Sequence, residues 1–205
     1  MTVAIIDYGM GNLGSVSGAL AELGASPVIT RQPADLAGAD RIILPGVGSF
    51  AEGMENLTGL GWVNAIRREV EAGKPLLGIC LGMQLLATRG TEGGDIAGLD
   101  FVPGVVKRLD TAGCDQRIPH VGWNSLAVTG RSHALLEGIP DGTDFYFVHS
   151  YVLEPANEAD VIGRTDYAVP FTSAVGRTRV LGTQFHPETS SKAGFRVLRN
   201  FLSFT

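Results

Sequence analysis

The sequence has few cysteines and no run of basic residues. Only Cys80 and Cys114 occur among 205 residues, too few for a disulfide framework, so each thiol has to be interpreted by itself. The 16 basic residues are outnumbered by 21 acidic ones, which gives a formal net charge of -5. This balance argues against binding to nucleic acid or to an anionic membrane, so we expect small molecules or proteins as partners.

Long apolar stretches are also missing. No run approaches the roughly 18 apolar residues that a membrane-spanning helix requires. Residues 1–9 form a short apolar segment without a basic leader, and Asp7 interrupts it before it reaches the length of a signal peptide. We therefore expect no membrane anchor, no export and a cytoplasmic location.

The length and composition favour one folded domain. With 44% hydrophobic and 18% charged residues, the chain can bury one large core but is short for two full domains. Its 28 glycines are scattered along the sequence, which indicates tight turns between regular elements and not a flexible linker. We expect a single domain that spans residues 1–205.

The first half alternates short apolar runs with helical patterns. The apolar runs lack polar alternation, as is typical of parallel strands that are covered by helices on both faces. The predicted strands cover residues 3–6, 28–30, 41–44 and 75–79, and the predicted helices cover 12–23, 50–71 and 81–87.

The second half contains short strand patterns separated by glycine and proline. The predicted strands cover residues 102–109, 145–148, 160–165, 171–175 and 180–184, and an amphipathic helix is predicted over 190–201. The sequence thus predicts an α/β fold with a mostly parallel central sheet, helices on both faces, and a β-rich, partly antiparallel C-terminal half.

Cys80 lies where a predicted strand meets a predicted helix. Residues 78–82 read Gly-Ile-Cys-Leu-Gly, the cysteine counterpart of a nucleophile elbow, in which small flanking residues allow a sharp and strained turn. A helix that begins next to the sulfur also favours a thiolate. An inert cysteine on a buried strand fits the local pattern equally well.

His186 and Glu188 follow the last predicted strand. A histidine can take a proton from a thiol while a nearby carboxylate orients its ring, and two residues of separation allow both groups to converge where a chain leaves a strand. Taken alone, the segment fits a His-Pro turn with a surface glutamate as well as it fits a catalytic pair. Together with Cys80, it favours a triad.

A glycine-rich segment over residues 45–50 ends another predicted strand. Its backbone N–H groups can form an oxyanion hole, in which each donor is typically worth about 3 kcal/mol to a transition state. A plain strand-to-helix loop or a weak phosphate-binding loop are the alternatives. A dinucleotide site is set aside, because Gly46 and Gly48 lack the third glycine of that motif, and so do Gly9 and Gly11.

These motifs resemble one known family from end to end. Residues 78–84 and 186–188 resemble the class I glutamine amidotransferases, which have a flavodoxin-like fold. Four further segments resemble, more narrowly, the glutaminase subunits of imidazole glycerol phosphate synthases; they are residues 7–12, 45–50, 119–124 and 146–151.

The resemblance implies a role for each triad member. Cys80 would attack the side-chain amide of glutamine to form a thioester, His186 would transfer protons, and Glu188 would orient His186. The oxyanion donors would be the backbone N–H groups of Leu81 and of Val47, the latter after a peptide flip that gates the reaction. The resemblance implies neither a metal ion nor a cofactor.

The resemblance also implies a glutamine pocket. Gln84 and Glu92 would bind the amino-acid end of glutamine, and the backbone around Gly48, Ser150 and Tyr151 would complete the site. Gln84 could instead be an ordinary helix-surface residue, and the position of Glu92 in its loop leaves a structural role equally open.

The implied partner is a (β/α)8 barrel synthase that uses the ammonia in histidine biosynthesis. Its products would be imidazole glycerol phosphate and an aminoimidazole carboxamide nucleotide. Four residues resemble interface or near-interface positions, although Trp123 and Tyr146 could equally be core residues; they are Asn12, His120, Trp123 and Tyr146.

One position departs from the family pattern. Members commonly have a lysine after the glutamate of the triad, in contact with an acid of the synthase, whereas this chain has Thr189. Lys192 follows closely but is not obviously placed to substitute for it. The other thiol, Cys114, has no elbow and no nearby base, so we interpret it as an incidental loop cysteine.

Three other functions remain open. The chain could serve a different synthase, such as one for pyridoxal phosphate or aminobenzoate formation, although segments 45–50 and 119–124 argue against this. It could be a non-catalytic scaffold of the same fold, although all three triad residues are present. It could also be a cysteine hydrolase that acts on small amides without a partner.

Overall fold

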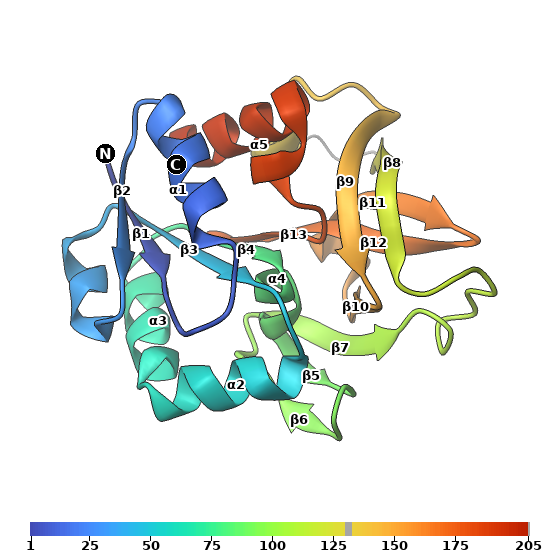
Figure 1. Ribbon diagram of the computed structural model, residues 1–205, viewed down its shortest axis with the longest axis horizontal. Helices are drawn as coiled ribbons and strands as arrows, with labels where there is room; N and C mark the ends of the chain where they lie inside the picture. The colour runs from blue at the N-terminus through green and yellow to red at the C-terminus, as the bar shows by residue number, and fades with distance from the viewer. Residues whose placement is uncertain (130–132, 205) are drawn as a thin grey trace.

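A nine-stranded sheet forms the centre of the fold in the computed structural model, which describes residues 1–129 and 133–204 (Figure 1). The strand order is β2-β1-β3-β4-β13-β12-β11-β8-β9. Its strands are β1 (Thr2–Ile6), β2 (Ser26–Thr30), β3 (Arg41–Gly46), β4 (Leu76–Cys80), β8 (His120–Val128), β9 (Thr143–His149), β11 (Val161–Tyr167), β12 (Val169–Arg177) and β13 (Val180–Thr183).

Pairing divides this sheet into two halves. The strands from β2 to β13 pair in parallel, and those from β13 to β9 pair antiparallel. A second, four-stranded sheet has the order β10-β7-β5-β6. Its strands are β5 (Ala87–Gly90), β6 (Ile96–Ala97), β7 (Val102–Arg108) and β10 (Tyr151–Pro155). The α/β class and the β-rich second half are thereby confirmed.

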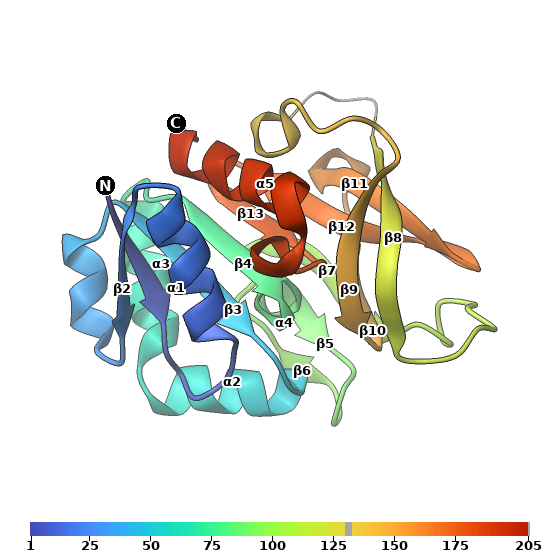
Figure 2. The same cartoon turned by 45° about the horizontal axis from the view of Figure 1, so that its top comes forward.

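Helices cover both faces of the parallel half (Figure 2). They are α1 (Leu13–Glu22), α2 (Phe50–Gly59), α3 (Trp62–Glu71), α4 (Leu81–Leu85) and α5 (Ser191–Ser203). Alternate strand residues point to opposite faces. Val3 and Ile5 pack with α1 and α5 in one core, whereas Ala4 and Ile6 pack with α2, α3 and α4 in another. None of the described helices is both long and apolar enough to cross a membrane.

Two predicted helices differ from the observed ones. The segment 50–71 forms two helices, because Gly61 adopts a left-handed conformation with φ of 78° between them. The helix after Cys80 ends at Leu85, since Ala87–Gly90 pairs with β7 as strand β5. Strands β5, β6, β8 and β10 were not predicted. Gly122 weakens the apolar pattern of β8, and pairing with neighbouring strands stabilises all four.

Gly78 and Gly82 bring three segments of backbone close together beside Cys80. A Cβ atom on Gly82 would lie 1.8 Å from the carbonyl oxygen of Leu44, and one on Gly78 would lie 2.6 Å from the carbonyl oxygen of Gly82. The obstacles are backbone atoms, which cannot move aside as a side chain can. Both glycines therefore allow neighbouring backbone to pass close beside Cys80.

We expect Gly82→Ala to lower the free energy of unfolding by about 3 kcal/mol or more, because the methyl group collides with the backbone of β3. Gly18→Ala is the matched control. Gly18 lies in α1 with open space around it, so alanine should stabilise the protein by about 1 kcal/mol. Urea unfolding measures both changes, and equal midpoints for Gly82→Ala and the wild type would contradict the close packing.

Candidate functional site

Three adjacent parallel strands end side by side at one edge of the sheet. In their register, Gly46 at the end of β3 lies opposite Cys80 at the end of β4. Thr183 at the end of β13 lies opposite Ile79, which brings the next residue, Gln184, alongside Cys80. The carboxyl ends of parallel strands are the usual location of sites in open α/β sheets. The register thus unites three segments that are distant in the sequence.

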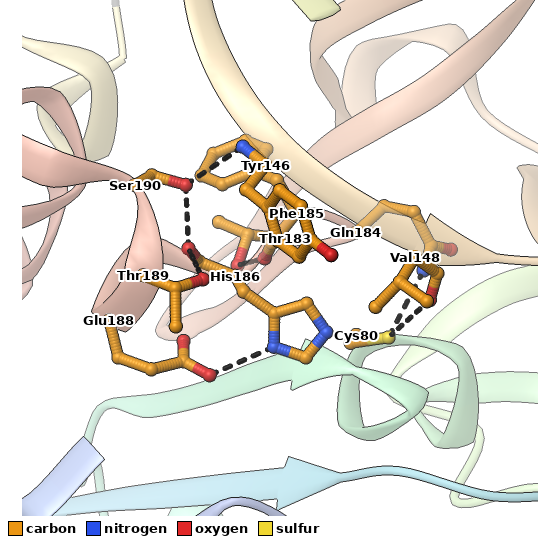
Figure 3. A network of polar contacts seen from close by, with 10 residues as sticks. All are labelled: Cys80, Tyr146, Val148, Thr183, Gln184, Phe185, His186, Glu188, Thr189 and Ser190. Atoms are coloured by element: carbon orange, nitrogen blue, oxygen red, sulfur yellow. Dashed lines mark hydrogen bonds and ion pairs between the residues drawn. The ribbon is translucent and has the colours of Figure 1, made fainter. Parts of the chain in front are cut away.

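Cys80 has the strained backbone that a nucleophile elbow requires. Its φ of 54° and ψ of -110° are unusual for a residue with a side chain. The residue is 6% exposed, and the next residue begins α4. Its Sγ atom lies 3.7 Å from the carbonyl oxygen of Val148 and 3.7 Å from Nε2 of Gln184 (Figure 3).

His186 lies between Cys80 and Glu188. Its Nδ1 is 2.8 Å from Oε1 of Glu188, and the opposite side of its ring points toward Cys80 (Figure 3). Within the described part of the chain, Nε2 of His186 has no hydrogen-bond partner. The pair is buried, since Glu188 and His186 are 8% and 6% exposed. The imidazole is therefore oriented on one side and available on the other.

Backbone contacts fix the position of His186. Its N–H donates to the carbonyl oxygen of Tyr146 over 3.0 Å. The hydroxyl of Ser190 donates to the carbonyl oxygen of His186 over 2.6 Å and accepts from the N–H of Tyr146 over 3.0 Å. The turn that holds His186 is consequently tied to β9, as Figure 3 shows.

The surroundings of His186 favour its protonated form. Burial alone lowers the pKa of this imidazole, but the nearby sulfur of Cys80 and the hydrogen-bonded, negatively charged Glu188 together outweigh burial and raise the pKa to about 10. The buried carboxylate of Glu188 thus stabilises the charge that the imidazole carries after it takes a proton.

A cavity of about 210 Å³ opens beside the Sγ atom of Cys80. Every residue predicted to bind glutamine or to form the oxyanion hole lines it; they are Val47, Gly48, Leu81, Gln84, Glu92, Ser150 and Tyr151. Three further lining residues were not predicted, namely Pro119, Val148 and His149. All three lie within segments 119–124 and 146–151, so their place in those motifs was the sequence signal for them.

Gln84 and Glu92 are structured parts of the cavity wall. Gln84 is 4% exposed, so it is not a helix-surface residue. Its Nε2 donates to the carbonyl oxygen of Tyr151 over 2.9 Å and to Oε1 of Gln184 over 3.0 Å. Oε2 of Glu92 accepts from the N–H of Phe50 at the start of α2, over 2.8 Å. Glu92 therefore both caps this helix and presents a carboxylate to the cavity.

The predicted interface residues divide into exposed and buried positions. Asn12 is exposed, Trp123 is 53% exposed, and Tyr146 is partly exposed opposite Trp123 on the hairpin of β8 and β9. His120 is only 3% exposed and stacks on Phe147 with 5.1 Å between ring centroids. The His120 side chain thus lies inside this chain and not on its surface.

Cys114 lies apart from the cavity. It is buried, and its Sγ contacts the carbonyl oxygen of Tyr167 at 3.3 Å. Among the residues that the structure describes, no group of three His, Cys, Asp or Glu side chains is arranged to hold a metal ion.

Comparison with known proteins decides the family. The profile of the Glutamine amidotransferase class-I family matches residues 4–203.

The chain belongs to the class-I glutamine amidotransferases.

Its similar relatives include two HisH subunits of imidazole glycerol phosphate synthase. The one from Moorella thermoacetica is 53% identical over 199 residues, which cover 97% of this chain and 93% of that protein. The one from Rhodospirillum rubrum is 46% identical over 210 residues, which cover 98% of each. This amidotransferase is accordingly a glutaminase of the HisH type, as the segments quoted from its sequence predict.

Solved structures show the same fold at low sequence identity. A crystal structure of a glutamine amidotransferase superposes with a TM-score of 0.77 at 24% identity, and covers 98% of this chain and 97% of that one. The structure of PurLQS from Thermotoga maritima gives a TM-score of 0.77 at 18% identity, and covers 99% and 98%. The predicted amidotransferase fold is thereby confirmed.

We expect Glu188→Gln to lower the pKa of His186 below its wild-type value, because the variant removes the negative charge behind the ring. NMR titration of the imidazole measures this change. An unchanged pKa would contradict the electrostatic role of Glu188.

The raised pKa of His186 also affects the free energy of unfolding. A histidine whose pKa is higher in the folded state than in the unfolded state stabilises the fold. This stabilisation is complete below the unfolded-state pKa of 6.5 and is lost as the pH rises through the folded-state pKa of about 10. The wild type should therefore lose more stability than Glu188→Gln between pH 7 and pH 10.

Proposed function

We propose that this chain hydrolyses glutamine to glutamate and ammonia through a thioester on Cys80, and that residues 1–205 do so as one domain. We further propose that it passes the ammonia to a (β/α)8 barrel partner that makes imidazole glycerol phosphate and an aminoimidazole carboxamide nucleotide. The observation that carries the proposal is the convergence of Cys80, His186 and Glu188 beside one cavity.

In the first half of the reaction, the thiol proton of Cys80 has passed to Nε2 of His186, and the Sγ thiolate attacks the side-chain carbonyl carbon of glutamine. The tetrahedral intermediate collapses when His186 returns that proton to the leaving nitrogen. Ammonia departs, and a glutamyl thioester remains on Cys80. Glu188 holds the ring through Nδ1, so Nε2 stays directed at the reacting atoms.

In the second half, water replaces ammonia. His186 takes a proton from the water, the hydroxide attacks the thioester carbon, and the returned proton releases the Cys80 thiol. The products are glutamate and the free enzyme. His186 and Cys80 both line the cavity, so His186 can serve as the base in both halves of the reaction.

Two backbone N–H groups are suited to stabilise the oxyanion. That of Leu81 follows Cys80 directly at the start of α4. That of Val47 follows Gly46, which the strand register places opposite Cys80. Gly48 has a φ of 133°, which a residue with a side chain rarely adopts, so glycine is required at this turn. We propose that a flip of the peptide before Val47 gates the oxyanion hole.

The remaining cavity wall can recognise the α-amino and α-carboxylate groups of glutamine. The carboxylate of Glu92 suits the ammonium group, and the backbone of Gly48, Ser150 and Tyr151 offers polar groups in the same cavity. Gln84 also lines the cavity, although both N–H groups of its amide are already engaged. We therefore assign Gln84 a contact through its carbonyl oxygen.

An exposed apolar surface next to the cavity mouth is the proposed contact with the barrel. It consists of the side chains of Val47, Val121, Trp123 and Val148, which are between 38% and 56% exposed. Val121 pairs with Val148, and Trp123 pairs with Tyr146, so these side chains share one face of the hairpin. Thr189 is exposed as well and cannot form the ion pair that the usual lysine makes.

The names of the relatives favour this function over the other synthases, since both relatives quoted are subunits of imidazole glycerol phosphate synthase. The intact His186–Glu188 pair disfavours a non-catalytic scaffold. A free-standing amide hydrolase is the second candidate, and partner dependence of the activity separates it from the first.

We expect Cys80→Ala to abolish glutamate release while the variant still binds its barrel partner, because the thiol is needed for the covalent step and is not needed for the fold. Cys114→Ser is the matched control and should retain full activity, since Cys114 lies away from the cavity. Steady-state assays of glutamate release measure the activity of each variant, and gel filtration of the complex measures its binding to the barrel partner. Hydrolysis by pure Cys80→Ala would refute the assignment of the nucleophile.

We expect Trp123→Ala to weaken binding to the barrel partner by at least about tenfold, because large exposed aromatic residues commonly dominate such interfaces. Leu60→Ala is the control, since Leu60 is equally exposed at the end of α2, outside the proposed surface. Calorimetric titration measures both affinities. Equal weakening by the two variants would place the interface elsewhere.

Partner dependence tests the proposed function as a whole. The isolated chain should release glutamate slowly, and a cognate barrel synthase with its nucleotide ligand should increase the rate. A high rate in the isolated chain that the synthase leaves unchanged would favour the free-standing hydrolase.

A further inference from the structure

A chain of buried hydrogen bonds ends on the sulfur of Cys80. Gln184 lies next to Cys80 because the parallel pairing of β13 with β4 aligns the two residues. It is completely buried, and its Nε2 lies 3.7 Å from Sγ of Cys80 (Figure 3). The triad mechanism leaves this contact without a role.

The carbonyl oxygen of Tyr151 determines which atom of Gln184 faces the sulfur. A carbonyl oxygen can only accept, so the Gln84 atom 2.9 Å away must be the nitrogen of its amide. The second N–H of that nitrogen faces Gln184 at 3.0 Å, and therefore faces its oxygen. The remaining amide atom of Gln184, directed at Cys80, is a nitrogen that carries a hydrogen.

The carbonyl oxygen of Tyr151 accepts a second hydrogen bond, from His149. Nδ1 of His149 donates to the carbonyl oxygen of Tyr151 over 3.0 Å, which uses its second lone pair. Nε2 of His149 then accepts from Nδ1 of His120 over 3.0 Å. Burial lowers the pKa of His149 to about 3 and that of His120 to about 4, so both rings are neutral and this tautomer is retained. Tyr151 is thus an acceptor that its neighbours hold in place.

The two neighbours of Sγ offer opposite hydrogen-bonding groups. The carbonyl oxygen of Val148 is an acceptor, which can accept from the S–H of the thiol. The N–H of Gln184 is a donor, which can donate to the sulfur. Among the described residues, His186 and Tyr8 both interact electrostatically with Cys80, and His186 supplies positive charge.

We propose that Gln184 is a further catalytic residue, whose amide N–H stabilises the thiolate of Cys80, and that Gln84 and Tyr151 fix its orientation. This inference rests on the proposed thioester mechanism. It gives Gln84 a second task, because the residue that lines the glutamine cavity also orients the donor to the nucleophile.

Two variants of Gln184 test the role of its N–H. Gln184→Met keeps a similar volume and removes the donor, whereas Gln184→Glu keeps an acceptor for Gln84 but turns a carboxylate oxygen toward the sulfur. Both are made in a Cys114→Ser background, so that Cys80 is the only thiol. Gln32→Met, at an exposed position outside the site, is the control.

The first readout is the rate of iodoacetamide alkylation of Cys80 against pH in the full chain. We expect the profile to move to higher pH by about one unit in Gln184→Met and further in Gln184→Glu, because a hydrogen bond to a charged group is lost. The second readout is glutaminase activity in the complex with the synthase. kcat should fall by about tenfold or more, with KM unchanged.

Each outcome has a distinct meaning. Wild-type alkylation profiles and kcat in both folded variants would overturn the role of Gln184, and the triad would stand if Cys80→Ala is inactive. An active Cys80→Ala would refute the mechanism and this inference together. Loss of the fold in both variants, seen by circular dichroism, would assign Gln184 a packing role and overturn the inference. Gln32→Met should match the wild type in both readouts.

Discussion

The parallel register of β3, β4 and β13 is the constraint on which the rest of the structure depends. It places Gly46 on one side of Cys80 and Gln184 on the other. Hydrogen bonding fixes this register, and a slip by one residue would turn each side chain to the opposite face of the sheet. The glycine turn, the nucleophile and the segment that carries the base are therefore all positioned by a single pairing pattern.

The same arrangement explains why the nucleophile can be strained without loss of the fold. Cys80 occupies a sparsely populated backbone conformation, which costs about 1–3 kcal/mol. Buried strands on both sides and the close passage of Leu44 over Gly82 hold it there. The base is held differently, since Ser190 and the backbone of Tyr146 fix its turn. Of the nucleophile and the base, only Cys80 has a positive φ, because His186 is extended with a φ of -95°.

Contact between Tyr146 and His186 also joins the proposed partner surface to the site. The outer face of the β8–β9 hairpin carries Trp123 and Tyr146, while the backbone of Tyr146 holds the turn of His186. Val148 belongs to the same strand and contacts the sulfur. A partner that shifts this hairpin would move groups on both sides of the reacting atoms.

Most of the fold was predictable from the sequence, because the apolar runs of the parallel half record burial on both faces. Strand β4 ends at Cys80 as predicted, and the amidotransferase motifs identified most of the cavity residues. Strand β8 was missed, since Gly122 and its half-exposed positions weaken the pattern. The burial of His120 was missed for a similar reason: its environment is formed by Phe147 and Tyr167, which are distant in sequence.

Gln184 could not be assigned from the sequence, because its role depends on strand register and on the orientation of two amides. The segment 184–188 was recognised for its histidine and glutamate alone. Only the pairing of β13 with β4 brings the first residue of that segment to the nucleophile.

Covalent trapping tests the central claim most directly. The full chain, in complex with its synthase, is incubated with a glutamine analogue that carries an electrophilic diazoketone in place of the amide, and the adduct is located by peptide mass spectrometry. The account predicts a single adduct on Cys80, which excess glutamine prevents. An adduct on Cys114, or labelling of Cys80 that glutamine does not affect, would contradict it.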